Sequence, residues 1–143
     1  MKKNKKEHPL VLIAHPDRDG DSDNLQLLRV TTGPDYTKLD FGYKAPDYYT
    51  RGGWVKINRE SHLLADGKAL RYDLINANHI PYGPDLLHFN SSNEWLYFSL
   101  VFQPVPISTK LIDLIEQVNP ADTDFNIYNI RLDDASKRME VFG

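Results

Sequence analysis

The sequence predicts an all-β fold, an antiparallel, Ig-like β-sandwich of roughly eight strands. Short segments that alternate apolar and polar residues recur along the chain, turn signals separate them, and no long segment has a clear helical period. The 143 residues suit one domain, and 41% hydrophobic residues are enough for a core. We expect this domain to span residues 9–133, between a disordered basic tail at 1–8 and a C-terminal tail at 134–143.

The expected strands follow one another along the chain, each bounded by a turn or a proline. In order they are residues 9–14, 24–32, 36–44, 54–58, the two arms of 61–74, 94–104 and 124–133. In the second segment Leu25, Leu27 and Val30 should face inward, and the broken alternation at Leu27 and Leu28 indicates a β-bulge. The third segment alternates without a break, so one of its faces should be buried. The fourth should place Trp54 inside.

Residues 61–74 carry the clearest local signature, because two strand-like arms flank Asp66 and Gly67. This pair favours a two-residue type I′ hairpin turn, which needs positive φ at both central positions. Residues 94–104 read as the strongest strand. One face carries Trp95, Tyr97, Ser99 and Val101, and the other carries Leu96, Phe98, Leu100 and Phe102. Since both faces are nearly apolar, we expect this strand at the centre of its sheet.

Residues 109–118 are ambiguous. Their apolar positions fit the stripe of an amphipathic helix, with Ser108 as a possible N-cap. The same segment is short, flanked by prolines and rich in isoleucine, which also suits a strand.

Several phrases of the chain occur together in a known family: "WVKIN", "LLADGKALRYDL", "IPYGPD", "EWLYFSLVFQPVPISTKLIDLIE" and "FNIYNIRL". Together they resemble a β-sandwich domain of secreted Bacteroidetes proteins, which often precedes a thioredoxin-like thiol–disulfide oxidoreductase domain. The matching positions are Trp54, Asp66, Gly67, Phe102, Pro104, Pro106, Thr109, Lys110, Asp113, Ile115, Glu116, Phe125, Ile127, Ile130 and Leu132. The resemblance implies a sandwich fold, a strand at 109–118 and a periplasmic or cell-envelope location. The sequence departs from the family's arrangement in lacking the redox domain and any cysteine for such chemistry. The resemblance implies no activity, because the β-sandwich domain itself has no known catalytic residues.

Composition narrows the function classes. The net charge of −3 gives no general attraction to nucleic acid or to an anionic membrane. Without cysteine there are no disulfides, thiolate nucleophiles or Cys-based zinc sites. No apolar run approaches the roughly 20 residues of a membrane span, and the N-terminal lysines are not followed by a signal-peptide core. The sequence leaves the oligomeric state open.

The stretch "AHPDRDGDSDNLQ" is the most pointed candidate for a metal site. It places aspartates at alternate positions, namely Asp17, Asp19, Asp21 and Asp23. Setting Gly20 as the sixth residue of a calcium loop puts His15 first and Gln26 twelfth, so the bidentate carboxylate is missing. We therefore expect a solvated loop that binds calcium weakly or not at all. The five histidines show no zinc spacing, and no cofactor site is expected.

The aromatic loop at residues 45–53 is the best functional candidate, with Tyr48, Tyr49 and Arg51 as the expected ligand-binding residues. Exposed tyrosines stack on sugars or anchor protein interfaces, and arginine adds directional hydrogen bonds. The alternative is structural: Tyr43 and Trp54 would belong to the core, with Tyr48 and Tyr49 capping its edge.

The sequence shows no catalytic constellation such as a nucleophile elbow or a phosphate-binding loop. The leading interpretation is a non-catalytic interaction or accessory module of the bacterial cell envelope that holds or presents a partner domain, a glycan or another subunit. A carbohydrate-binding module using the aromatic loop is the second interpretation. A small metal-dependent hydrolase using His15 and the aspartates is the third.

Overall fold

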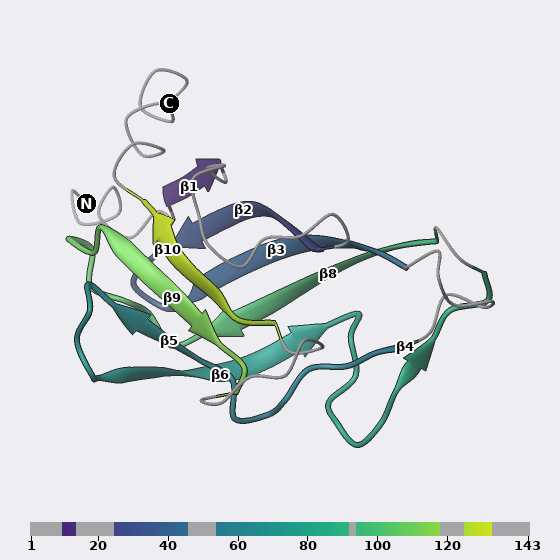
Figure 1. Ribbon diagram of the computed structural model, residues 1–143. Helices are drawn as coiled ribbons and strands as arrows, with labels where there is room; N and C mark the ends of the chain where they lie inside the picture. Colours follow the sequence, from purple (N-terminus) through teal and green to yellow (C-terminus); the bar gives the residue numbers. More distant parts are fainter. Residues whose placement is uncertain (1–9, 14–24, 46–53, 92–93, 118–124, 133–143) are drawn as a thin grey trace.

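A computed structural model describes residues 10–13, 25–45, 54–91, 94–117 and 125–132 (Figure 1). These residues form β-strands, turns and extended segments and include no helix, which confirms the all-β prediction. The strands are β1 (Leu10–Ile13), β2 (Leu25–Thr32), β3 (Thr37–Lys44), β4 (Trp54–Val55), β5 (His62–Ala65), β6 (Arg71–Asn78), β7 (Leu87–His88), β8 (Trp95–Phe102), β9 (Leu111–Ile115) and β10 (Ile127–Arg131). The described residues contain no helix long and apolar enough to cross a membrane.

Eight of the described strands form one curled antiparallel sheet in the order β1-β2-β3-β8-β6-β5-β9-β10, and β4 pairs with β7 in a separate ribbon. The curl brings β5, β9 and β10 across from β2, β3 and β8, so that two layers enclose the core (Figure 1). This arrangement is sandwich-like, as the strand pattern predicts. The finer Ig-like description stays a prediction.

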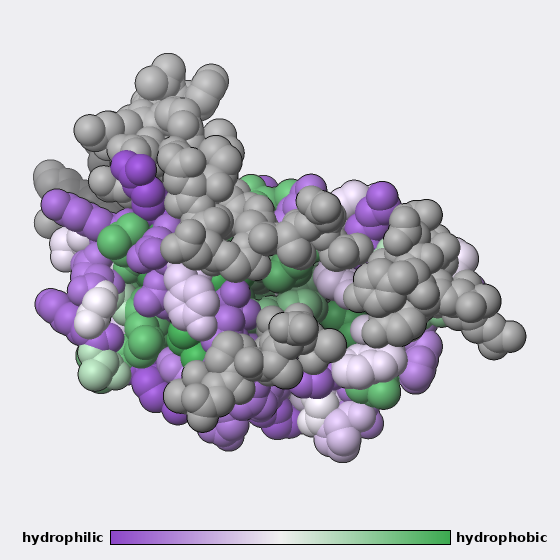
Figure 2. All heavy atoms as spheres, in the orientation of Figure 1, coloured by the Kyte–Doolittle hydropathy of each residue, from purple (hydrophilic) through white to green (hydrophobic). Residues whose placement is uncertain are grey.

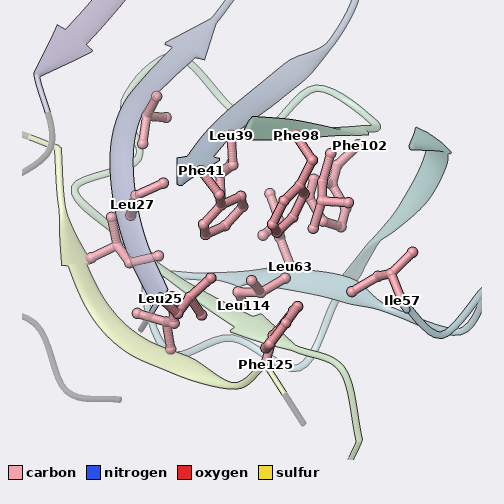
Figure 3. Packing of buried hydrophobic residues seen from close by; sticks show 14 of the residues in the cluster. Leu25, Leu27, Leu39, Phe41, Ile57, Leu63, Phe98, Phe102, Leu114 and Phe125 are labelled. Carbon is pink, nitrogen blue, oxygen red and sulfur yellow. The ribbon is translucent and has the colours of Figure 1, made fainter. Parts of the chain in front are cut away.

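The core lies between the two layers and is built from the inward residues of each strand (Figure 3). Phe98 of β8 is its centre: its ring stacks on Phe41 at 5.0 Å between centroids and on Phe125 at 6.0 Å. From the opposite layer, Leu63 and Leu114 are fully buried. The alternating apolar residues of the sequence thus supply one continuous core.

The bulge expected in β2 is present. The register of β2 against β3 shifts between Leu27 and Arg29, so that Leu25, Leu27 and Val30 all point inward. Residues 109–118, which periodicity left open, contain the strand β9. It pairs with β5 on one side and β10 on the other, so its backbone groups are satisfied by neighbours that a local pattern does not reveal.

The Asp66-Gly67 turn is confirmed, but the hairpin is longer than predicted. Both residues have positive φ, 53° and 72°, and the Lys68 N–H donates to the Ala65 carbonyl at 3.0 Å. Pairing of β5 with β6 nevertheless begins only at Leu64 and Arg71. At this end of β5 the Asp66 N–H donates to the Leu111 carbonyl, so the pairing with β9 extends further along the chain than the pairing with β6.

The expected burial of Trp54 is wrong. Its side chain is 42% exposed, whereas Val55 and Ile57 are 3% and 0% exposed. β4 is only two residues long, and Val55 and Ile57, which are two positions apart, both turn toward the core. Trp54 lies on the opposite side.

Candidate functional site

β8 lies between β3 and β6, so its central position in the sheet is confirmed. Only one of its faces is buried, however. Phe98, Leu100 and Phe102 are at most 2% exposed, whereas Trp95 and Tyr97 on the outer face are 43% and 62% exposed. One face of this nearly apolar strand therefore remains exposed. The second layer packs against the inner side of β8.

The two exposed rings form a defined arrangement with the neighbouring strands. Trp95 and Tyr97 are nearly parallel, with an interplanar angle of 9° and centroids 6.0 Å apart. Gly42 of β3 lies directly opposite Tyr97, and a Cβ added there would lie 3.3 Å from each ring and 3.6 Å from Leu28. Both rings and Leu28 therefore converge over the bare backbone of Gly42. We call Leu28, Gly42, Trp95 and Tyr97 the aromatic platform.

A polar row borders the aromatic platform on the same face. Arg29, Asp40, Ser99 and Asn78 are successive partners across β2, β3, β8 and β6. Arg29 Nε donates to Asp40 Oδ2 at 2.9 Å, and Ser99 Oγ donates to Asp40 Oδ1 at 2.6 Å. Burial opposes ionisation of Asp40, but the hydrogen bonds from Ser99 and Arg29 prevail and lower the pKa of its carboxyl group. Asp40 is thus held as a carboxylate.

The structure brings together different residues from those expected at the sequence level. Tyr48, Tyr49 and Arg51 lie outside the described residues, as do His15 and the Asp17–Asp23 loop. Tyr43 packs against the core, as its structural reading predicts, with its ring centroid 5.8 Å from that of Phe89 and 5.7 Å from that of Phe125.

Sequence reasoning missed the aromatic platform. The alternation placed Trp95, Tyr97 and Ser99 on one face, and the serine was a signal that this face reaches solvent. The pairing of Tyr97 with Gly42 depends on the register between β3 and β8, which the sequence does not show.

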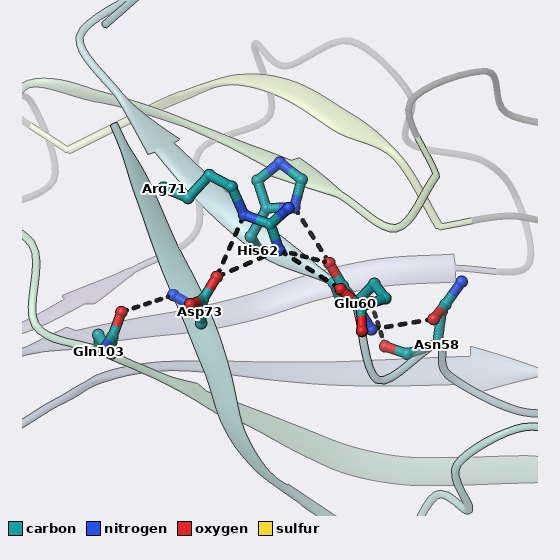
Figure 4. A network of polar contacts seen from close by, with 7 residues as sticks. Asn58, Glu60, His62, Arg71, Asp73 and Gln103 are labelled. Carbon is teal, nitrogen blue, oxygen red and sulfur yellow. Dashed lines mark hydrogen bonds and ion pairs between the residues drawn. The ribbon is translucent and has the colours of Figure 1, made fainter. Parts of the chain in front are cut away.

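A second polar cluster joins the ends of β5, β6 and β8 (Figure 4). The buried His62 contacts the Glu60 carbonyl at 3.1 Å through Nδ1, which must carry the proton because a carbonyl only accepts. Arg71 Nη2 donates to the same carbonyl and pairs with Asp73 at 3.2 Å. The Asp73 N–H donates to Gln103 Oε1. These contacts hold the strand ends together.

Glu116 is a buried carboxylate with a structural role. Its side chain is 1% exposed, and Lys56 Nζ lies 3.6 Å from Oε2. Oε2 accepts from the Asn58 N–H at 2.8 Å, and Oε1 accepts from the Phe125 N–H at 2.6 Å. Asn126 Oδ1 in turn accepts from the Glu116 N–H. Glu116 thereby ties the end of β9 to the segments that follow β4 and precede β10.

The described residues include no group of three or more His, Asp or Glu side chains placed to hold a metal ion. In the view of Figure 2, hydrophilic residues occupy much of the rim of the molecule. The chain matches no known family model, and neither a curated protein nor a solved structure is significantly similar to it.

Proposed function

We propose that this chain is a non-catalytic binding module that recognises its ligand on the outer face of β2, β3 and β8. The observation that carries the proposal is the aromatic platform, where Trp95 and Tyr97 remain 43% and 62% exposed on a central strand. Exposed Trp and Tyr on a rigid element are typical of recognition surfaces, because they offer large contact areas at low entropic cost.

The other polar clusters support binding rather than catalysis. His62 bonds to the Glu60 carbonyl two residues before it, and Asp66 and Glu116 bond to backbone groups of neighbouring segments. A general acid or base needs a proton-transfer atom directed at a substrate. The polar atoms of these three side chains bond to the backbone instead, so they hold strands and loops in place. The resemblance of several sequence phrases to secreted β-sandwich domains is the reason for proposing a role as an accessory module of the cell envelope.

The test compares retention on immobilised protein. We expect the wild type to retain a component of soluble cell-envelope fractions, either protein or polysaccharide. The double variant Trp95→Ser/Tyr97→Ser should lose it while keeping its melting temperature, since both side chains lie on the outer face. Trp54→Ser is the matched control, because Trp54 is 42% exposed but lies on β4. Equal retention by the folded double variant, or no retention by the wild type, contradicts the proposal.

A further inference from the structure

We infer that the ligand of this face is a neutral carbohydrate chain that stacks on Trp95 and Tyr97. The inference rests on the proposed function, because it names the ligand class for the same face. A sugar ring presents an apolar C–H surface that packs on an aromatic ring, and a rim of hydroxyl groups that both donate and accept hydrogen bonds. A suitable site therefore combines an exposed aromatic surface with adjacent polar groups of both kinds.

The aromatic part of this requirement is met by a preorganised pair of rings. Trp95 and Tyr97 are parallel to within 9°. Both reach over Gly42, where an added Cβ would lie 3.3 Å from each ring, so the rings lie close to the bare backbone of the strand. Leu28 closes the other side. Rings held in this way lose little freedom when a ligand binds, which favours affinity.

The polar part follows directly along β8. Ser99 is two residues beyond Tyr97 and lies on the same face, so the polar row crosses β8 about 6.6 Å along the strand from the Tyr97 backbone. The row offers donors and acceptors together: the 55% exposed Arg29 guanidinium, the Asp40 carboxylate and the Asn78 amide. A chain lying along β8 would place one sugar on the rings and the hydroxyl groups of the next over this row.

Charge favours a neutral ligand over a nucleic acid. Asp40 pairs with both neighbouring cations, Arg29 at 2.9 Å and Lys38 at 3.7 Å. Single-stranded nucleic acid binds where stacking rings line a strongly positive groove. Here two of the three cations that the described residues of β2, β3 and β8 place on the outer face, Arg29 and Lys38, share Asp40. The third, Lys44, lies opposite Trp95. With an acid among these cations and −3 on the whole chain, the face is not a strongly positive groove.

The extent of the apolar surface favours a carbohydrate over a protein partner. A stable protein interface buries about 800 Å² on each side around an apolar centre. The aromatic platform exposes three apolar side chains and borders at once on the charged pair of Arg29 and Asp40. A narrow apolar strip beside a polar row suits a single polysaccharide chain.

The sequence offers a direct optical test, because Trp54 and Trp95 are its only tryptophans. In the Trp54→Phe variant, fluorescence reports on Trp95 alone. We expect one or more of cellohexaose, xylohexaose, maltohexaose, laminarihexaose, mannohexaose and chitohexaose to change its emission with a saturating curve and a Kd of about 1 mM or tighter. Adding Tyr97→Ala should weaken this Kd at least about tenfold. Adding Leu86→Ala, at a 40% exposed position outside the platform, should leave it unchanged.

The outcomes separate the ligand class from the proposed function. The inference is overturned if none of the six sugars changes the emission at about 10 mM, or if Tyr97→Ala keeps the wild-type Kd. If Trp95→Ser/Tyr97→Ser instead abolishes binding of a thymidine oligonucleotide or an envelope protein, this face is a binding site of another class. If the folded double variant keeps every interaction of the wild type, both the ligand class and the proposed function fail.

Discussion

Replacing Glu116 by glutamine tests how much one buried carboxylate holds together. Each of its oxygens accepts a backbone N–H, from Asn58 at 2.8 Å and from Phe125 at 2.6 Å. An amide has only one oxygen, so in either orientation an NH₂ group faces one of these donors. Losing a charge-assisted hydrogen bond costs about 1.5–3 kcal/mol, and the unsatisfied donor adds about 1–3 kcal/mol. Because these contributions overlap, we expect Glu116→Gln to lower the free energy of unfolding by about 2–4 kcal/mol.

Urea denaturation measures this loss. With a slope of about 2 kcal/mol/M, the midpoint should fall by about 1–2 M without a change in slope. Glu60→Gln is the matched control, because the Glu60 side chain is 81% exposed and lies 3.9 Å from Arg71. That variant should stay within about 0.5 kcal/mol of the wild type. Equal urea midpoints for the two variants would refute the conclusion that Glu116 joins the end of β9 to the segments that follow β4 and precede β10.

Three further substitutions probe the core, the turn and the platform. Phe98→Ala should cost about 3–5 kcal/mol in urea denaturation, and a loss below about 1 kcal/mol would contradict its central burial. Backbone N–H groups of Leu111 and the residue before it hold the pKa of Asp66 below its ordinary value of 3.8. The ionised Asp66 carboxylate therefore stabilises the fold fully above pH 3.8, and this stabilisation disappears as the pH falls through the lower pKa of the folded state. The difference in urea midpoint between the wild type and Asp66→Asn should accordingly narrow on acidification. A constant difference down to about pH 2 would contradict this linkage. Gly42→Val should push the Trp95 ring outward, and a red-shifted emission when Trp95 is the only tryptophan checks it; unchanged emission would contradict the close approach.

Much of the architecture could be predicted from local patterns. The β2 bulge followed from the inward positions of Leu25, Leu27 and Val30, because Leu27 and Val30 are three residues apart and cannot face the same side of a regular strand. The Asp66-Gly67 turn followed from the need for positive φ. The alignment of β5 with β9 could not be predicted, because strand partners distant in sequence leave no local periodicity. The local sequence also predicted a two-residue hairpin, whereas pairing between β5 and β6 begins only at Leu64 and Arg71.

The aromatic platform was harder to predict than the fold. An aromatic residue at an alternating strand position fits a buried face and an exposed one equally well, and Trp54, Trp95 and Tyr97 all proved exposed. Whether such a face is buried or exposed depends on whether a second layer covers it, and this depends on how the sheet curls. The aromatic loop with Tyr48 and Tyr49 remains a prediction.

The strand order also governs how the chain is made. β3 pairs with β8, and the contact between Asp40 and Ser99 joins residues 59 positions apart. At about 5–20 residues per second, a ribosome needs several seconds to synthesise the intervening segment. Until then the N-terminal hairpin has an unpaired edge at β3 and an uncovered apolar face. Both are sites for wrong pairing with another chain. The interval between synthesis of β3 and of β8 is therefore when a chaperone would protect this protein most.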